Sequence, residues 1–304
     1  MKTPVVFIIF NRPDTTAKVF AAIRQAQPAK LLVIADGARS DRPSEAEKCA
    51  ATKAIIDRVD WECEVLTNYS DVNLKGMLRI STGLDWAFTQ VDRAIILEDD
   101  CLPHPSFFPF CEELLDRYQD DERIMAISGD NFQFGRNHTG YSYYFSRYPH
   151  CWGWATWRRA WQHYDINMNL WQKIRDGNWL QAIFKEPSTV KYWQKIFQAI
   201  YEKRITHGWD YRWTFACWIQ NGLIILPHVN LVTNIGFGSG ASNTTDSTSK
   251  NANLPIQEMY FPLQHPPFVL CHFRADDFTQ KTHFDKNLFE RALAKGKKIF
   301  NSNF

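Results

Sequence analysis

Short apolar runs alternate with amphipathic stretches along the first 130 residues, and this alternation constrains the fold more than any other feature of the sequence. The runs are rich in β-branched and aliphatic residues, as expected of strands buried on both faces. They lie at residues 5–10, 31–35, 63–67, 94–97 and 124–128. Between them, apolar residues recur every three or four positions, which is typical of helices packed on a sheet. Strands alternating with helices predict a parallel α/β sheet with right-handed crossover connections.

The second part of the chain has a different character. Residues 141–161 are crowded with Tyr, Phe and Trp. Helical patterns and one further strand follow, at residues 170–184, 189–204, 209–220 and 223–226. We therefore expect an α/β half, residues 1–130, and a more helical, aromatic-rich half, residues 131–304, within one globule.

Composition excludes several classes of protein. Hydrophobic residues make up 45% and charged residues 22%, which is too apolar a chain for intrinsic disorder. Lys and Arg number 35 against 33 Asp and Glu, and a net charge of +2 argues against a dedicated nucleic-acid binder. The apolar runs are far shorter than the roughly 20 residues of a membrane span. Seven cysteines without a CxxC pair, and no signal-peptide pattern, predict reduced thiols and a cytoplasmic location.

Three consecutive carboxylates, Glu98, Asp99 and Asp100, follow the run at 94–97. In open α/β sheets, ligands bind at this end of the strands. Because side chains alternate along a strand, we expect Glu98 and Asp100 to share a face and Asp99 to point away from them. A hard cation, Mn²⁺ or Mg²⁺, suits such a cluster and keeps water and phosphate oxygens as its other ligands. In the alternative interpretation, the triplet only opens a loop before the next helix.

Two further polar residues follow the first two strands. An Arg at position 12 can bind phosphate oxygens, and an Asp at position 36 can accept a hydrogen bond from a nucleotide base. A helix cap and a surface ion pair are the alternatives. Lys75 and Arg79, near the start of the next helical stretch, could neutralise a diphosphate or could lie on a solvated helix face. His272 could complete a metal shell or be a structural histidine.

Four segments resemble a known family. They read IIFNRPDT (8–15), LLVIADGA (31–38), AIILEDDCLPHPSFF (94–108) and IMAISGDN (124–131). They are similar to GT-A fold glycosyltransferases, most of all the bacterial family 2-like enzymes, over about residues 4–240. The EDD triplet followed by a Pro…Phe-Phe helix also resembles N-acetylglucosaminyltransferase I.

The resemblance implies a GT-A (Rossmann-like) sheet that binds a nucleoside diphosphate sugar in residues 1–130 and an acceptor in residues 131–304. EDD takes the place of the DXD motif: Asp100 binds Mn²⁺ or Mg²⁺ with Glu98 in support, and Asp99 contacts the ribose. Asp36 and Arg12 would contact the base or phosphate, and Arg79 would join them in binding the nucleotide sugar. The motif begins with Glu rather than Asp, which leaves the division of roles among the three carboxylates open.

A transferase also needs a base for its acceptor, and the segment at 205–213 (ITHGWDYRW) offers one. An Asp beside large aromatic rings tends to have a raised pKa, which suits a general base. Asp210 is therefore our candidate, and it resembles the catalytic Asp of inverting GT-A enzymes; an N-cap role is the alternative. His207 is more typical of a structural or acceptor-site residue. The Trp residues at 152–157 could be core or could stack on sugar faces.

Together these features predict a metal-dependent glycosyltransferase that uses a UDP-linked donor and inverts the anomeric carbon. Its acceptor would be a glycan or a lipid-linked molecule. Residues 234–245 (NIGFGSGASNTT) are expected to form a lid over the donor, with a plain surface loop as the alternative. Residues 284–304 are expected to form a basic amphipathic helix that either contacts the inner membrane face or packs on the domain with a solvated basic face. The alternatives are a nucleotidyltransferase acting on a sugar phosphate and a non-catalytic carbohydrate-binding protein.

Overall fold

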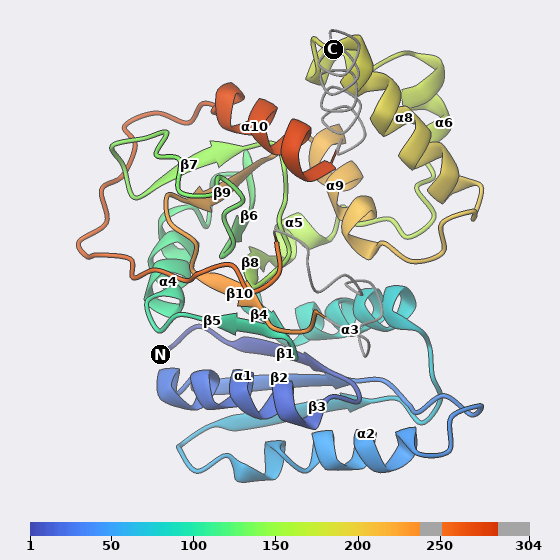
Figure 1. Cartoon of the computed structure of the whole chain (residues 1–304), viewed down its shortest axis with the longest axis vertical. Helices are drawn as coiled ribbons and strands as arrows, with labels where there is room; N and C mark the ends of the chain where they lie inside the picture. The colour runs from blue at the N-terminus through green and yellow to red at the C-terminus, as the bar shows by residue number, and fades with distance from the viewer. Residues whose placement is uncertain (238–250, 285–304) are drawn as a thin grey trace, which may run out of the picture.

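An eight-stranded sheet with the order β3-β2-β1-β4-β8-β6-β9-β7 runs through the molecule (Figure 1). The structure is a computed structural model that describes residues 1–237 and 251–284. The strands are β1 (Val5–Ile9), β2 (Lys30–Ala35), β3 (Glu64–Tyr69), β4 (Arg93–Glu98), β6 (Ile124–Ser128), β7 (Tyr143–Ser146), β8 (Trp154–Trp157) and β9 (Leu223–Pro227).

The sheet is mostly parallel. β1 pairs in parallel with β2 and β4, β2 with β3, and β6 with β9, whereas β8 is antiparallel to both β4 and β6, and β7 is antiparallel to β9. The predicted fold class, a mostly parallel α/β sheet flanked by helices, is confirmed. All five strands predicted in the first 130 residues are present.

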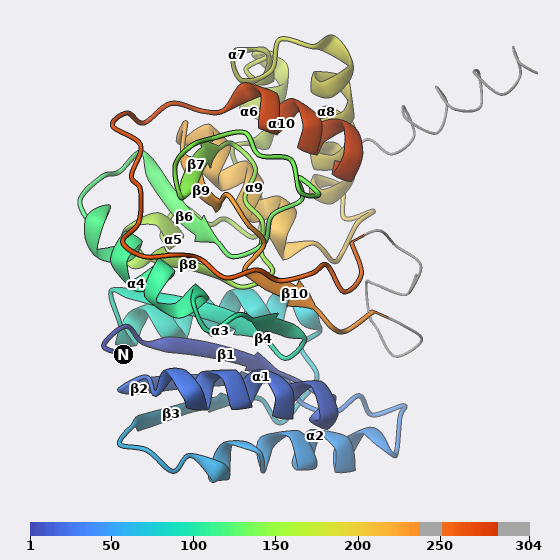
Figure 2. The same cartoon turned by 60° about the vertical axis from the view of Figure 1, so that its left-hand side comes forward.

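Helices cover both faces of this sheet (Figures 1 and 2). They are α1 (Pro13–Ala26), α2 (Glu45–Lys53), α3 (Gly76–Gln90), α4 (Phe107–Arg117), α5 (Arg158–Trp161), α6 (Trp171–Asp176), α7 (Leu180–Ile183), α8 (Pro187–Tyr201), α9 (Trp209–Ile219) and α10 (Phe273–Thr279), with a 3₁₀ turn η1 (Ile56–Arg58) and a π-helical turn η2 (Gln280–Phe284). A small antiparallel pair, β5 (Cys101–Pro103) and β10 (Val232–Asn234), lies beside the sheet.

The alternation of side chains along β1 divides the core into two layers. Val5, Phe7 and Ile9 pack with apolar residues of α1 and α4, and Val6 and Ile8 pack with those of α3 and α9. All five are buried, as a continuous apolar run requires. Because β1, β2, β4 and β6 run in one direction, their carboxyl ends meet at one edge of the sheet.

The aromatic stretch 141–161 supplies β7, β8 and α5. The sequence pattern alone did not indicate the two strands. Trp154 and Trp157 are 1% and 3% exposed, so these two rings belong to the core. α6, α7 and α8 gather at one end of the molecule, opposite β3 and α2 (Figures 1 and 2).

Two sequence predictions fall largely outside the described residues: the lid, beyond residue 237, and the C-terminal basic helix, beyond residue 284. All seven cysteines are described and none is in a disulfide. In the part of the chain that the structure describes, no helix combines the length and apolar character needed to cross a bilayer.

Candidate active site

The carboxyl ends of β1 and β4 bring Arg12 against the acidic triplet. Arg12 Nη1 forms an ion pair with Asp100 and lies 3.6 Å from Asp99 Oδ1. The backbone amide of Phe10, at the end of β1, donates a hydrogen bond to Asp99 Oδ2 at 3.0 Å. The two neighbouring carboxylates therefore converge on one cationic position.

The expected alternation of the triplet is wrong. Only Glu98 belongs to β4, and Asp99 and Asp100 form a turn between β4 and β5. Once the chain leaves the extended conformation, the two-residue period no longer applies. Consequently Asp99 and Asp100, rather than Glu98 and Asp100, face the same partner.

One guanidinium does not balance three carboxylates here. Burial and then repulsion from Asp100 raise the pKa of Asp99 to about 7. Burial, followed by the charges of Asp100, Asp99 and Asp210, raises the pKa of Glu98 well above its usual range. The triplet thus lacks positive charge, which an additional cation would supply.

Asp36 and Arg79, the other two predicted nucleotide contacts, are hydrogen-bonded to neighbouring backbone groups. Asp36 Oδ1 accepts hydrogen bonds from the amides of Gly37 (3.0 Å) and Leu74 (2.9 Å), and burial raises the Asp36 pKa. Arg79 is only 5% exposed and donates to the Ala35 carbonyl at 3.2 Å and to Asn68. Arg79 therefore lies beneath the edge, where it joins the ends of β2 and β3. Lys75 precedes α3 with a positive φ of 67°.

The chain after β10 forms a close wall beside the triplet. The Ile235 amide donates to the Asp100 carbonyl at 2.8 Å. A Cβ atom at Gly236 would overlap Asp100 Oδ2 and would lie 2.8 Å from Arg12 Nη1. Only a glycine leaves room for the ion pair at this distance.

Asp210 lies in the first turn of α9. The N-cap of α9 is Gly208, with φ 92°, and no side chain caps the helix, so the alternative of an Asp210 N-cap is wrong. Burial raises the pKa of Asp210, and the charge of Asp210 in turn contributes to raising the pKa of Glu98. The neighbouring Trp209 ring stacks on Trp154 of β8 at 5.6 Å and anchors the start of α9 to the sheet. His207 is exposed.

The remaining candidates separate into structural and accessible groups. His272 caps α10: its Nδ1 accepts from the Ala275 amide at 3.2 Å, and its Nε2 lies 3.0 Å from the His138 carbonyl. Both ring nitrogens are engaged, so the proposed role of His272 in a metal shell is wrong. Trp152 is half-buried, and the centroid of its ring lies 5.7 Å from that of Phe237, the residue after Gly236.

A buried Asp–His pair escaped the sequence analysis. His150 Nδ1 lies 3.5 Å from Asp130 Oδ2, and each side chain is 1% exposed. Among residues 1–237 and 251–284, neither side chain has a hydrogen-bond partner. Burial raises the pKa of Asp130 well above its usual range and lowers that of His150 to about 4. The sequence did contain a signal for Asp130, because it lies two residues after the end of β6, just as Asp100 lies two residues after the end of β4.

Cys151 is half-buried and lies within the electrostatic influence of several of these groups. Burial, followed by the charges of Asp210, Asp130 and Glu98, raises the pKa of its thiol well above the usual range. Negative charge at the ends of β4 and β6 and at the start of α9 therefore acts on one thiol.

The donor set fits a hard divalent cation. Among residues 1–237 and 251–284, no three His, Cys, Asp or Glu side chains are arranged as a complete metal site. Mg²⁺ and Mn²⁺ need fewer protein ligands, since one or two carboxylates with water and phosphate oxygens suffice. Asp99 and Asp100 already converge on a cationic group, and the raised pKa of Glu98 indicates uncompensated negative charge.

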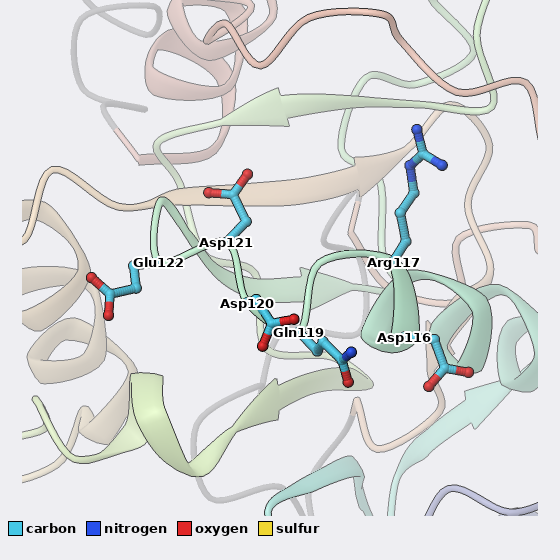
Figure 3. Close-up of a pocket in the computed structure, with 6 residues that line it drawn as sticks. All are labelled: Asp116, Arg117, Gln119, Asp120, Asp121 and Glu122. Atoms are coloured by element: carbon cyan, nitrogen blue, oxygen red, sulfur yellow. The ribbon is translucent and has the colours of Figure 1, made fainter.

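A hollow elsewhere on the surface lacks converging carboxylates. It is lined by Asp116, Arg117, Gln119, Asp120, Asp121 and Glu122. These residues connect α4 to the start of β6, so they lie at the edge opposite the triplet. Their side chains spread outward rather than converge (Figure 3).

Comparisons with known proteins give distant structural likenesses only. No protein-family model matches the sequence, and no curated protein matches it. Mouse xyloside xylosyltransferase 1 is 12% identical, with 73% of this chain and 84% of that one covered and a TM-score of 0.36. An apo UDP-glucose pyrophosphorylase is 12% identical, with 73% and 90% covered and a TM-score of 0.34. The 4-diphosphocytidyl-2C-methyl-D-erythritolsynthase of Anaerococcus prevotii is 9% identical, with 52% and 72% covered and a TM-score of 0.33.

Proposed function

We propose that this protein is a metal-dependent glycosyltransferase that moves a sugar from a UDP-linked donor to an acceptor hydroxyl with inversion. One observation carries the proposal: Asp99 and Asp100 converge on one cationic position at the carboxyl edge of the sheet. A second carboxyl group, Asp210, has a pKa raised by burial, and its charge acts on Glu98. The first group suits a diphosphate with its cation, and the second suits proton transfer.

On the donor side, Asp100 with Glu98 would hold Mn²⁺ or Mg²⁺, which supplies positive charge against the leaving diphosphate. Asp99 would contact the ribose, its position fixed by the Phe10 amide. Arg12 would bind a phosphate oxygen or the base, and Asp36 the base. Arg79 supports the site from below by fixing the strand end that carries Asp36.

On the acceptor side, Asp210 would take the proton from the attacking hydroxyl. Burial raises its pKa, which makes the carboxylate a stronger proton acceptor than an exposed one. Trp152 is the aromatic residue of the 152–157 cluster that we assign to sugar stacking, because Trp154 and Trp157 are core residues. A glycan or a lipid-linked molecule would serve as acceptor.

The two alternatives fit less well. A nucleotidyltransferase would carry a Gly-rich loop with Lys or Arg after β1, whereas this chain has Asn11-Arg12-Pro13-Asp14 there. A carbohydrate-binding protein would account for the aromatic residues but not for two buried carboxylates and a half-buried one at a strand end.

The direct test is a thermal-shift series with UDP, GDP and CMP, each with and without Mn²⁺. We expect UDP to raise the melting temperature only with Mn²⁺, and Asp100→Ala to abolish that rise. Glu47→Ala, an exposed carboxylate of α2, is the matched control and should behave like the wild type. Stabilisation by a free sugar alone would favour the carbohydrate-binding alternative, and equal shifts with Asp100→Ala would refute the metal site.

A further inference from the structure

Basic residues concentrate at one end of the molecule. Residues 170–205, here called the basic lobe, contain seven Lys and Arg against three Asp and Glu, although the whole chain carries only +2. The lobe comprises α6, α7 and α8, which lie together at the end opposite β3 and α2 (Figures 1 and 2). The rest of the chain is correspondingly poorer in positive charge.

Most of this charge is not neutralised within the lobe. Arg175 pairs with Asp176, and Arg204 pairs with Glu202. Within the described residues, no ion pair involves the lobe's five exposed lysines, which are Lys173, Lys185, Lys191, Lys195 and Lys203. Lys191 and Lys195 are one helical turn apart on α8, whose other face buries Trp193 and Phe197. The outer face of α8 is therefore cationic.

Two large apolar side chains project from the same lobe. Trp179, between α6 and α7, is 62% exposed, and Leu170, before α6, is 44% exposed. Trp at the surface of a basic region is typical of proteins that rest on a bilayer, because its amphipathic ring favours the headgroup region.

The end of the described chain meets the lobe. The Phe284 ring packs against Trp193 of α8, with centroids 5.0 Å apart. The sequence that continues from Phe284, residues 285–304, contains five Lys and Arg against two Asp and Glu. The described chain thus ends against α8 of the basic lobe, and the sequence that follows is itself basic.

We infer that the basic lobe docks onto an anionic lipid surface, with Lys191 and Lys195 at the lipid headgroups and the Trp179 ring inserted among those headgroups. Unpaired lysines supply attraction to anionic headgroups, and the exposed Trp and Leu supply apolar anchors, which a purely electrostatic polyanion site would not need. A second copy of this chain would not fit the surface, because like charges would meet. This inference does not depend on the proposed catalytic function.

The experiment is flotation of the full chain with vesicles. We expect binding to phosphatidylcholine vesicles containing phosphatidylglycerol and little binding to phosphatidylcholine alone, with attraction that weakens as salt is raised. Lys191→Gln/Lys195→Gln should reduce binding about tenfold or more, and Trp179→Ala should reduce it without changing its salt dependence. Lys18→Gln/Lys48→Gln removes the same charge from the exposed faces of α1 and α2 and should bind as the wild type does.

Three results would overturn the inference: no binding of the wild type to anionic vesicles, equal loss in the Lys18/Lys48 control, or lobe-dependent binding to heparin in the absence of vesicle binding. Melting temperatures close to that of the wild type verify that each variant is folded, as expected for exposed side chains.

Discussion

Arg12 is the residue on which the candidate site most depends. It faces two carboxylates of a triplet in which burial, together with repulsion among the carboxylates, raises the pKa of Asp99 and Glu98. The sequence predicted that Arg12 and the acidic triplet lie at the same edge, because the strand ends of a parallel sheet meet there. The motif could not predict the turn that rotates Asp99 towards Arg12.

Asp210→Asn tests the proposed base. The amide keeps the size of the side chain but cannot accept a proton, so we expect turnover to fall about 10²–10⁴-fold while UDP–Mn²⁺ affinity stays within a few-fold of the wild type. Calorimetry for the nucleotide and a transfer assay with the same preparation make the comparison. Turnover close to the wild type in a folded Asp210→Asn protein would exclude Asp210 from the reaction.

His150 gives a prediction about pH. The unfolded chain takes up a proton on this imidazole near pH 6.5, whereas burial holds the folded pKa at about 4. Acid therefore favours the unfolded state, and we expect up to about 3 kcal/mol of the free energy of unfolding to be lost between pH 6.5 and 4. Urea titrations across that range should show that the free energy of unfolding falls less steeply with acidification in His150→Gln than in the wild type.

The control for this experiment is His163→Gln, which should keep the pH slope of the wild type. Equal slopes in wild type and His150→Gln would mean that Asp130 stabilises the imidazolium instead. Sequence analysis missed this pair because its contact depends on the path of the loop before β8, which no local pattern specifies.

At the scale of elements, local periodicity predicted the helices and strands whose patterns are strong. The spacing of apolar residues predicted a helix between the third and fourth strands, and α3 (Gly76–Gln90) lies there. β7 and β8 were not predicted, because dense aromatic residues satisfy helix and strand patterns equally. The insertion of β8 between β4 and β6 is a long-range pairing, which the order of elements along the chain does not determine.

The segment after β10 permits a test of its close approach to the triplet. In Gly236→Ala the new methyl group would displace Asp100 and Arg12, so we expect UDP–Mn²⁺ affinity to fall roughly tenfold, as for other overpacked sites. Gly140→Ala is the matched control, because no atom lies within 4 Å of its added Cβ. Unchanged affinity in a folded Gly236→Ala protein would contradict the geometry of this wall.

At the scale of the whole molecule, the sheet joins the two halves that the sequence distinguishes. β8 and β9 come from the second half and are the partners of β6, which belongs to the first. We therefore expect a fragment of residues 1–130 to lack cooperative unfolding, since its β6 would have no neighbour and β4 would expose an apolar edge. Thermal denaturation followed by circular dichroism, with the full chain as control, would show it; a cooperative transition in the fragment would refute the expectation.

The pairing of Arg12 with Asp99 and Asp100 also has a consequence for the resting protein. A tethered counterion already offsets part of the negative charge of the triplet, so folding would not require free metal. If the protein is the metal-dependent enzyme proposed above, metal starvation would then leave it folded and inactive, and added metal would restore activity without refolding. Chelator treatment should accordingly leave the nucleotide-free protein folded, with a cooperative thermal transition.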